Sequence, residues 1–342
     1  MYLAADLFRE DGKICIDWNG RPYDATLAGI PEAFWQLETV QAQQGVRAYL
    51  EELLCFLHNK YWGMVDAAIL IIPWHFTYPQ KKALKAIAAQ AGIDRVRLGY
   101  ATELAAYDYL QHLHESSEVN LFICLCQGRR VEFSFCNAGD GVAESFGVTG
   151  TCRGKDEPEE SFLRKTLGEL RQFQKELPRN DCPDYRILLL GEVPDALSRE
   201  IKARLPQCAG TEPCLSASPV WAAILHIRSV WGPQDNGLLM SQQPRNLWAA
   251  LGDLGEQRMV VPRYTSFPLR KSADLLVSTQ TLLHIYEGNF QNPRFDTLLA
   301  SFPLPQAEEG HEITCAIDMN ADGSLSLEVK THRGDTLLQE KL

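Results

Sequence analysis

Several residue groups in this chain have types and spacing that could bind a metal ion. The segment from Asp318 to Gly323, DMNADG, opens like a calcium loop, in which alternating oxygens and a sixth-place glycine wrap the ion. The twelfth place is Val329 instead of an acid, and both flanks alternate like strands, which favours a hairpin turn. His112 and His114 lie two apart on a predicted helix and point away from each other. None of these groups predicts a metal site.

A second set of residues concerns thiols and anions. Cys124 and Cys126 share one face of a predicted strand, where burial is the better interpretation. Arg129 and Arg130 follow Gly128 in a tight turn, and their guanidinium groups are able to pair with phosphate. Two arginines in such a turn are more often a solvated tip, so this is what we predict.

The first two thirds of the chain alternate between apolar strands and amphipathic helices. The apolar strand at 67–72 is predicted to be covered on both faces, and a helix with Pro79 near its start and Gly92 at its end follows it. Strands near 119–125, 130–136 and 142–148, a helix from about 160, a strand at 185–190 and two more helices predict a second α/β lobe. A preceding helix is indicated by an apolar stripe of Val46, Leu50, Leu53, Leu54 and Leu57.

The last third has a different texture, with Pro, Gly and short alternating segments typical of an antiparallel sandwich. The predicted organisation is a domain at 1–232 with lobes of about 1–118 and 119–232, a linker at 233–245, and a domain at 246–342. The linker holds Leu238, Leu239 and Met240.

Several motifs resemble the heat-shock chaperones of the DnaK type. IIPWHF, QKKALKAIAAQAG and GYATELAA, between residues 71 and 106, are similar to that family's V-P-A-Y-F strand end, Gln/Lys/Ala-rich helix and N-E-P-T-A-A-A helix start. NLFICLCQGRRVEFSF from Asn120 stands where its phosphate hairpin lies, and YRILLLGEVPDALSREI from Tyr185 where its adenosine loop lies. HIYEGNF from His284 and AIDMNADGSLSLEV from Ala316 resemble motifs of its peptide-binding sandwich. The resemblance covers most of residues 44–342.

The resemblance implies a fold that is α/β plus all-β. A reduced actin-like module of the chaperone ATPase type would be followed by an antiparallel β-sandwich of the substrate-binding type, without a helical lid. The family's first phosphate turn has no recognisable counterpart, and the chain is expected to begin after it. That loss would leave an open sheet edge, which a partner, a second copy or a separate fragment would cover.

The nucleotide site implied by the resemblance is degenerate. Leu125 stands where the family has a metal-linked aspartate, and Tyr100 where it has a glutamate. What remains of a nucleotide site is weak, namely Gly128, Arg129, Arg130 and Gly191. We expect no ATPase activity and no required cofactor, with ATP or ADP and Mg²⁺ as the ligands if the cleft is retained.

The resemblance also implies a peptide site in the sandwich. Its candidate residues are Leu254, Leu275, Thr281 and Leu283, which are equally compatible with an ordinary sandwich core. A cleft without a lid would release peptide quickly.

Composition narrows the class of protein. A net charge of −11 argues against binding of nucleic acid or anionic membrane, and no segment has the length of a signal peptide or a membrane span, so a cytoplasmic protein is expected. The function predicted first is binding of unfolded or extended polypeptide without ATP hydrolysis. The alternatives are an ATP-dependent chaperone and a docking or assembly protein whose reduced lobe binds a partner.

Overall fold

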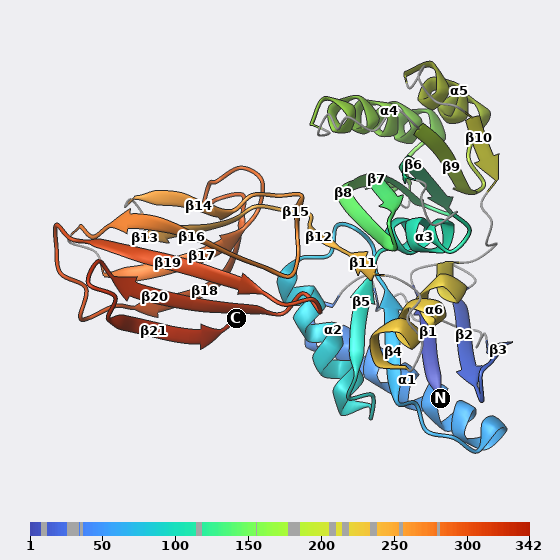
Figure 1. Cartoon of the computed structure of the whole chain (residues 1–342), viewed down its shortest axis with the longest axis horizontal. Helices are drawn as coiled ribbons and strands as arrows, with labels where there is room; N and C mark the ends of the chain where they lie inside the picture. The colour runs from blue at the N-terminus through green and yellow to red at the C-terminus, as the bar shows by residue number, and fades with distance from the viewer. Residues whose placement is uncertain are drawn as a thin grey trace. The chain divides into compact units, whose positions relative to one another are not determined.

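The computed structural model shows a mixed α/β protein with six helices and five sheets in the described residues, none of them closed into a barrel (Figure 1). The described residues are 1–7, 12–25, 34, 37–113, 118–154, 156–176, 185–204, 210–213, 219–232, 238–252, 256–278 and 281–342. They divide into one unit of Met1–Phe76 with Gln80–Leu239, and a second of Thr77–Pro79 with Met240–Leu342. No helix in these residues is long and apolar enough to cross a membrane.

The first unit is built from two copies of one arrangement. The first copy consists of β1 (Tyr2–Asp6), β2 (Lys13–Trp18), β3 (Arg21–Asp24), α1 (Val40–Tyr61), β4 (Ala67–Ile71), α2 (Tyr78–Gln90), β5 (Val96–Gly99) and α3 (Ala101–Leu110). The second consists of β6 (Glu118–Gln127), β7 (Arg130–Gly139), β8 (Val142–Cys152), α4 (Glu159–Glu176), β9 (Tyr185–Gly191), α5 (Asp195–Arg204), β10 (Gly210–Pro213) and α6 (Pro219–Trp231).

The two sheets have the same strand order and directions. The first is β3-β2-β1-β4-β5, and five strands of the second are ordered β8-β7-β6-β9-β10, with a sixth strand added beside β8. In both, antiparallel pairs lie on one side of the central strand and parallel pairs on the other. The last helix of each copy packs on the sheet of the other copy, α3 on β7 and β8, and α6 on β1 and β2. The first unit is therefore an internal duplication whose copies are interlocked.

The local sequence explains these elements. Thr39 caps α1 by accepting a hydrogen bond from the Ala42 N–H at 3.2 Å, and Trp62 ends it in the left-handed region. Four residues of the predicted stripe are buried and the fifth, Leu54, is half-buried; the buried ones are Val46, Leu50, Leu53 and Leu57. All of β4 is buried, as its continuous apolar run predicts.

The expectation that the chain lacks the first hairpin is wrong. β1 is the middle strand of the first sheet, and β1–β2 occupies the place that β6–β7 has in the second sheet. The segment between these strands lacks the D-L-G-T-T sequence by which the resemblance identifies such a hairpin, whereas the two copies share strand order and direction. An edge left open by missing strands is therefore not a feature of this sheet.

The segment predicted as linker contains a strand. Residues 238–240 form β11 (Leu238–Met240), which joins the second sheet beside β8, and the Leu238 N–H donates to Gly141 O at 2.8 Å. Leu239 is buried in the core of the first unit. These three residues are therefore held beside β8 by strand pairing. The first unit ends within this strand, at Leu239.

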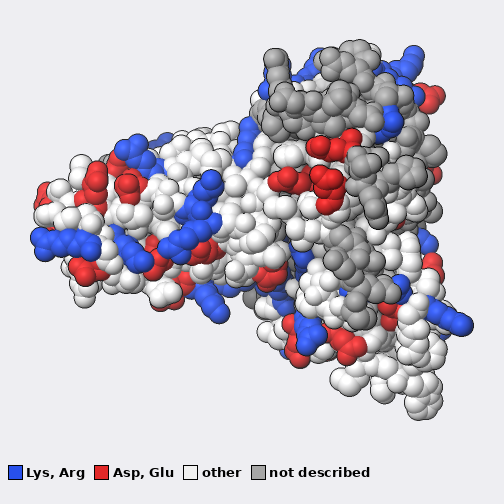
Figure 2. Space-filling model, viewed as in Figure 1, with Lys and Arg blue, Asp and Glu red and all other residues white. Residues whose placement is uncertain are grey.

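The second unit contains two four-stranded antiparallel sheets, ordered β14-β13-β17-β18 and β16-β19-β20-β21, and the small β12-β15 pair. One core holds buried side chains of both larger sheets, including Leu247, Ile285, Ile317 and Leu327. Basic and acidic side chains are interspersed on the face seen in Figure 2. The strands of the second unit are β12 (Gln242–Gln243), β13 (Leu247–Leu251), β14 (Gln257–Val261), β15 (Thr265–Ser266), β16 (Leu269–Leu276), β17 (Leu282–Glu287), β18 (Thr297–Pro303), β19 (Glu312–Met319), β20 (Leu325–Thr331) and β21 (Thr336–Lys341).

Candidate functional site

A buried cluster of charged side chains lies where the two copies of the first unit meet. Asp6 is the last residue of β1, Arg130 is the first residue of β7, and Glu132 follows two residues later on the same strand face. The exposed fractions are 0% for Asp6, 1% for Arg130 and 0% for Glu132. Charged residues are almost never buried this fully unless they are paired.

The guanidinium group of Arg130 is the centre of this cluster. Its Nη2 lies 3.3 Å from Asp6 Oδ2 and donates to Gln127 Oε1 at 2.7 Å. Its Nε lies 3.6 Å from Glu132 Oε1, which also accepts the Trp74 N–H at 3.2 Å. The cluster therefore connects β1 and the segment after β4 in the first copy with the β6–β7 hairpin in the second.

Burial and charge act in opposite directions on these groups. Burial alone would lower the pKa of Arg130, but the charges of Glu132 and Asp6 raise it above its ordinary value. Burial raises the pKa of Glu132, and the nearby Arg130 charge offsets only part of that rise. We conclude that Arg130 is always charged and that it lies as a counter-ion beside both Asp6 and Glu132.

The cluster contains the residue types of a phosphoryl-transfer site in a different arrangement. In such sites carboxylates hold Mg²⁺ and basic groups contact phosphate. Here the two carboxylates share an internal guanidinium. Arg130 Nη1 and Glu132 Oε2 are buried without a hydrogen bond to any described residue, so the cluster is not fully satisfied by protein groups.

The solvated tip predicted for Arg129 and Arg130 is correct only for Arg129. Gly128 and Arg129 form a two-residue turn between Gln127 and Arg130, which pair with each other. Gly128 has φ +55°, the sign that a type II′ turn requires at its first position. Because Arg130 already belongs to β7, its side chain is directed into the protein while Arg129 stays exposed.

Gly191, the other glycine assigned to a nucleotide site, is needed for packing. It has φ +76°, and a Cβ atom at this position would lie 2.0 Å from Cys126 O. The next N–H, that of Glu192, donates to the same carbonyl at 3.1 Å. The close approach of β9 to β6 thus accounts for this glycine without a phosphate.

A cysteine and a histidine meet near the charged cluster, a pairing that sequence reasoning missed. Cys152 Sγ lies 3.7 Å from His75 Nδ1. Burial, and then the charge of Glu132, raise the pKa of the Cys152 thiol to about 11. A thiol with this pKa is protonated at neutral pH, so the pair lacks the thiolate that nucleophilic catalysis needs.

The residues assigned to the peptide site lie mainly inside the second unit. Leu275 and Leu283 are 0% exposed and belong to the shared core. Thr281 is half-buried, and its carbonyl accepts the Leu304 N–H at 2.6 Å. Leu254 lies outside the described residues. The Leu275 and Leu283 side chains are fully buried, and their peptide-binding role stays a prediction.

The exposed leucines are one residue away from the predicted ones. Leu276 is 51% exposed and Leu282 is 41% exposed, and both border the loop between β16 and β17. Successive residues of a strand point to opposite faces, so an assignment wrong by one residue exchanges core and surface.

The remaining candidates carry no reactive geometry. DMNADG at 318–323 forms the β19–β20 hairpin turn, as predicted, with the Gly323 N–H donating to Asn320 O. Cys124 and Cys126 are buried with their sulfur atoms 3.9 Å apart. His112 is exposed, and His114 lies outside the described residues. In the described part of the chain, no group of three His, Cys, Asp or Glu side chains is placed to hold a metal ion.

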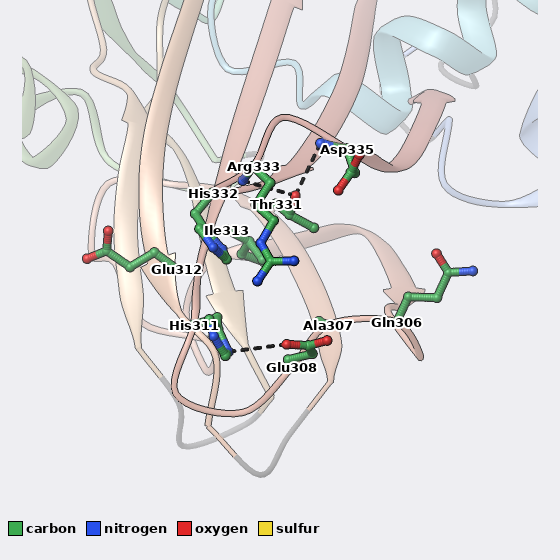
Figure 3. A pocket seen from close by; sticks show the side chains of 10 residues that line it. All are labelled: Gln306, Ala307, Glu308, His311, Glu312, Ile313, Thr331, His332, Arg333 and Asp335. Carbon is green, nitrogen blue, oxygen red and sulfur yellow. Dashed lines mark hydrogen bonds and ion pairs between the residues drawn. The ribbon is translucent and has the colours of Figure 1, made fainter.

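Two hollows are lined by residues that do not belong to the charged cluster. Figure 3 shows one of about 80 Å³ in the second unit, where His311 contacts Glu308 at 3.5 Å. The rings of His311 and His332 stack there with centroids 5.2 Å apart. The other, of about 240 Å³, lies between the β2–β3 hairpin and α6, with Tyr23 and Trp221 among its walls.

Asp6 and Glu132 were missed by the sequence reasoning, although a signal for both exists. Each is the single acid within a mainly apolar strand segment, YLAAD and RVEFSF. An acid in a strand covered on both faces requires a buried counter-charge, for which Arg130 was available.

No protein-family profile matches the chain, and no curated protein is significantly similar to it.

Proposed function

We propose that this chain is a divergent relative of the DnaK-type heat-shock chaperones that binds extended polypeptide without hydrolysing ATP. In this proposal the first unit is an actin-like module and the second is a β-sandwich. The duplicated β-β-β-α-β-α-β-α arrangement supports the first assignment. Two antiparallel sheets around one core support the second.

The observation that carries the ATP-independent part is the burial of Arg130 between Asp6 and Glu132. For Mg²⁺·ATP to use these carboxylates, the guanidinium would have to leave them. Its departure would take the neighbouring positive charge away from two buried acids until the metal arrived, which is costly in a desolvated site. The protein's own cation therefore competes directly with the metal.

Polypeptide binding is supported by exposed apolar residues on the second unit. Leu276 and Leu282 border the loop at which the sequence resemblance implies a peptide cleft. Exposed apolar groups gathered beside a sheet are typical of protein interaction surfaces. Main-chain pairing to sheet edges is an established way to hold extended segments of varied sequence.

The test is calorimetric titration of the full chain with ATP and ADP in Mg²⁺, alongside fluorescence anisotropy with a labelled leucine-rich peptide. We expect peptide binding and no nucleotide heat. Nucleotide binding would instead support the ATP-dependent chaperone. Silence in both titrations would refute the proposed function and leave a docking role.

The role proposed for Arg130, excluding Mg²⁺·ATP, is tested with a matched pair of variants. Arg130→Gly removes the internal cation and Arg129→Gly removes the exposed neighbour. If Arg130 excludes the metal nucleotide, then only the first change should create detectable Mg²⁺·ATP binding in a variant that is still folded by circular dichroism.

A further inference from the structure

An aromatic row crosses the outer face of one sheet in the second unit. The strand registers place Met259 beside Trp248, Trp248 beside Tyr286, and Tyr286 beside Leu298. The Trp248 and Tyr286 rings stack with centroids 4.2 Å apart, in a cluster separate from the shared core. The row is buried in its middle and exposed at its ends, with Met259 39% and Leu298 48% exposed.

The loop between β17 and β18 is held in place beside this row by a buried carboxylate. Asp296 Oδ2 accepts hydrogen bonds from Trp248 Nε1 at 2.9 Å and from the Asn292 N–H at 3.2 Å. Asp296 Oδ1 accepts the Phe290 N–H at 3.2 Å. A Cβ atom on Gly288 would lie 2.0 Å from that same oxygen, so the loop is closely packed at its start.

This fixed loop presents two phenylalanines to solvent. Phe290 is 72% exposed and Phe295 is 71% exposed, and their ring centroids are 5.8 Å apart. Exposed large aromatic side chains are unfavourable in water, and a pair held on an ordered loop is a ready interaction surface. Together with Leu298 we call these residues the aromatic edge.

The aromatic edge lies at one end of an edge strand. β18 pairs only with β17 among the described strands, which leaves one side of its backbone without a partner strand. The register Leu282↔Pro303 places the exposed Leu282 beside the other end of β18. An extended chain along this edge would therefore meet apolar side chains at both ends.

Charge selects the occupant. Between residues 288 and 304 the only ionisable side chains are Arg294 and the buried Asp296, so the exposed charge of this stretch is positive. Arg294 makes no ion pair with a described residue. The net charge of −11 opposes the pairing of two copies. The local positive charge of Arg294 favours a segment that places an acid beside it.

We propose that β18 and the aromatic edge form the binding site for an extended segment of another polypeptide, apolar and aromatic in its centre and acidic at the end near Arg294. The segment adds to the sheet as a strand alongside β18. This inference rests on the proposed function and identifies its site, which differs from the pocket of Leu275 and Leu283.

The test uses the full chain and two labelled peptides of seven residues, the length of β18. Both alternate Phe or Val with Thr, and one carries two aspartates where its twin carries two lysines. We expect the acidic peptide to bind more tightly. The double variant Phe290→Ser/Phe295→Ser should weaken its binding by about tenfold or more, as is usual for aromatic residues at an interface centre. Arg294→Glu should reverse the preference between the peptides.

Control variants separate the possible failures. Trp62→Ser removes an 87% exposed aromatic of the first unit and should leave binding unchanged. If the peptides bind but the double variant binds like wild type, the proposed site is wrong. Leu276→Ser/Leu282→Ser then tests whether the peptides bind beside the loop between β16 and β17 instead. If neither peptide binds wild type, the proposed function itself fails. If sedimentation shows a dimer that the double variant abolishes, the occupant is a second copy and the inference is overturned.

Discussion

Arg130→Met is the most informative single change because it removes the charge but keeps much of the side-chain volume. The substitution removes the positive charge that lies beside the carboxylates of Asp6 and Glu132, both of which are 0% exposed. Breaking a buried ion pair by removing one partner costs about 3–5 kcal/mol. We expect a loss of this size in the free energy of unfolding.

The assay is urea unfolding monitored by tryptophan fluorescence. Six of the seven tryptophans lie outside the second unit, whose single tryptophan is Trp248, so the signal reports mainly on the rest of the chain. Arg129→Met on the exposed neighbour is the matched control, with a change within about 0.5 kcal/mol. The triple variant Arg130→Met/Asp6→Asn/Glu132→Gln should recover part of the loss, because neutral groups need no counter-ion.

The direction of the pH dependence provides a second check. Without Arg130, the folded-state pKa of Glu132 rises further above its unfolded value. The deficit of Arg130→Met should therefore be largest at neutral pH and shrink as the pH falls and the carboxyl is protonated. Equal stability of the Arg129 and Arg130 variants would refute the reasoning about the cluster.

Three further predictions concern other parts of the fold. The first concerns His226, which is buried. Burial, and to a lesser extent the charge of Arg97, lowers its pKa to about 3 in the folded protein, whereas an unfolded histidine has a pKa of about 6.5. Below about pH 6.5 the unfolded state therefore binds the proton and is favoured. The contribution of His226 is complete above that pH and is lost on acidification, so wild type should lose about 2 kcal/mol more than His226→Leu between pH 7 and pH 5 in urea titrations. Gly191→Ala should cost at least about 2 kcal/mol more than Gly141→Ala, since both glycines have positive φ but only the first has a carbonyl in the way; equal losses would contradict the packing argument. Asp296→Asn should lower thermal stability, because the new amide N–H₂ group would face N–H donors that now donate to a carboxylate. Asp274→Asn, on the exposed surface of β16, is the control. An unchanged melting temperature of the Asp296 variant would show that the loop does not depend on this carboxylate.

The sequence predicted those elements whose signals are local. The stripe from Val46 to Leu57 and the apolar run of β4 each report the face that they bury, and the structure confirms both. The turn at Gly128 was likewise expected from a single residue type. Local periodicity is enough for such elements because their burial is set by their own side chains.

The charged cluster could not be derived in the same way. Arg129 and Arg130 are identical residues, and only the turn register places one outside and the other inside. The partner Asp6 is 124 residues away, so its proximity depends on the interlocked copies. For Leu275 and Leu276 the difficulty is the two-residue period, because neighbours in one strand occupy opposite faces.

The central claim is that polypeptide binding is independent of nucleotide. The most direct measurement is anisotropy of the labelled acidic peptide with the full chain, titrated with and without Mg²⁺·ATP. The account predicts saturable binding and two superimposable curves. A peptide that does not bind, or a curve that Mg²⁺·ATP displaces, would contradict it.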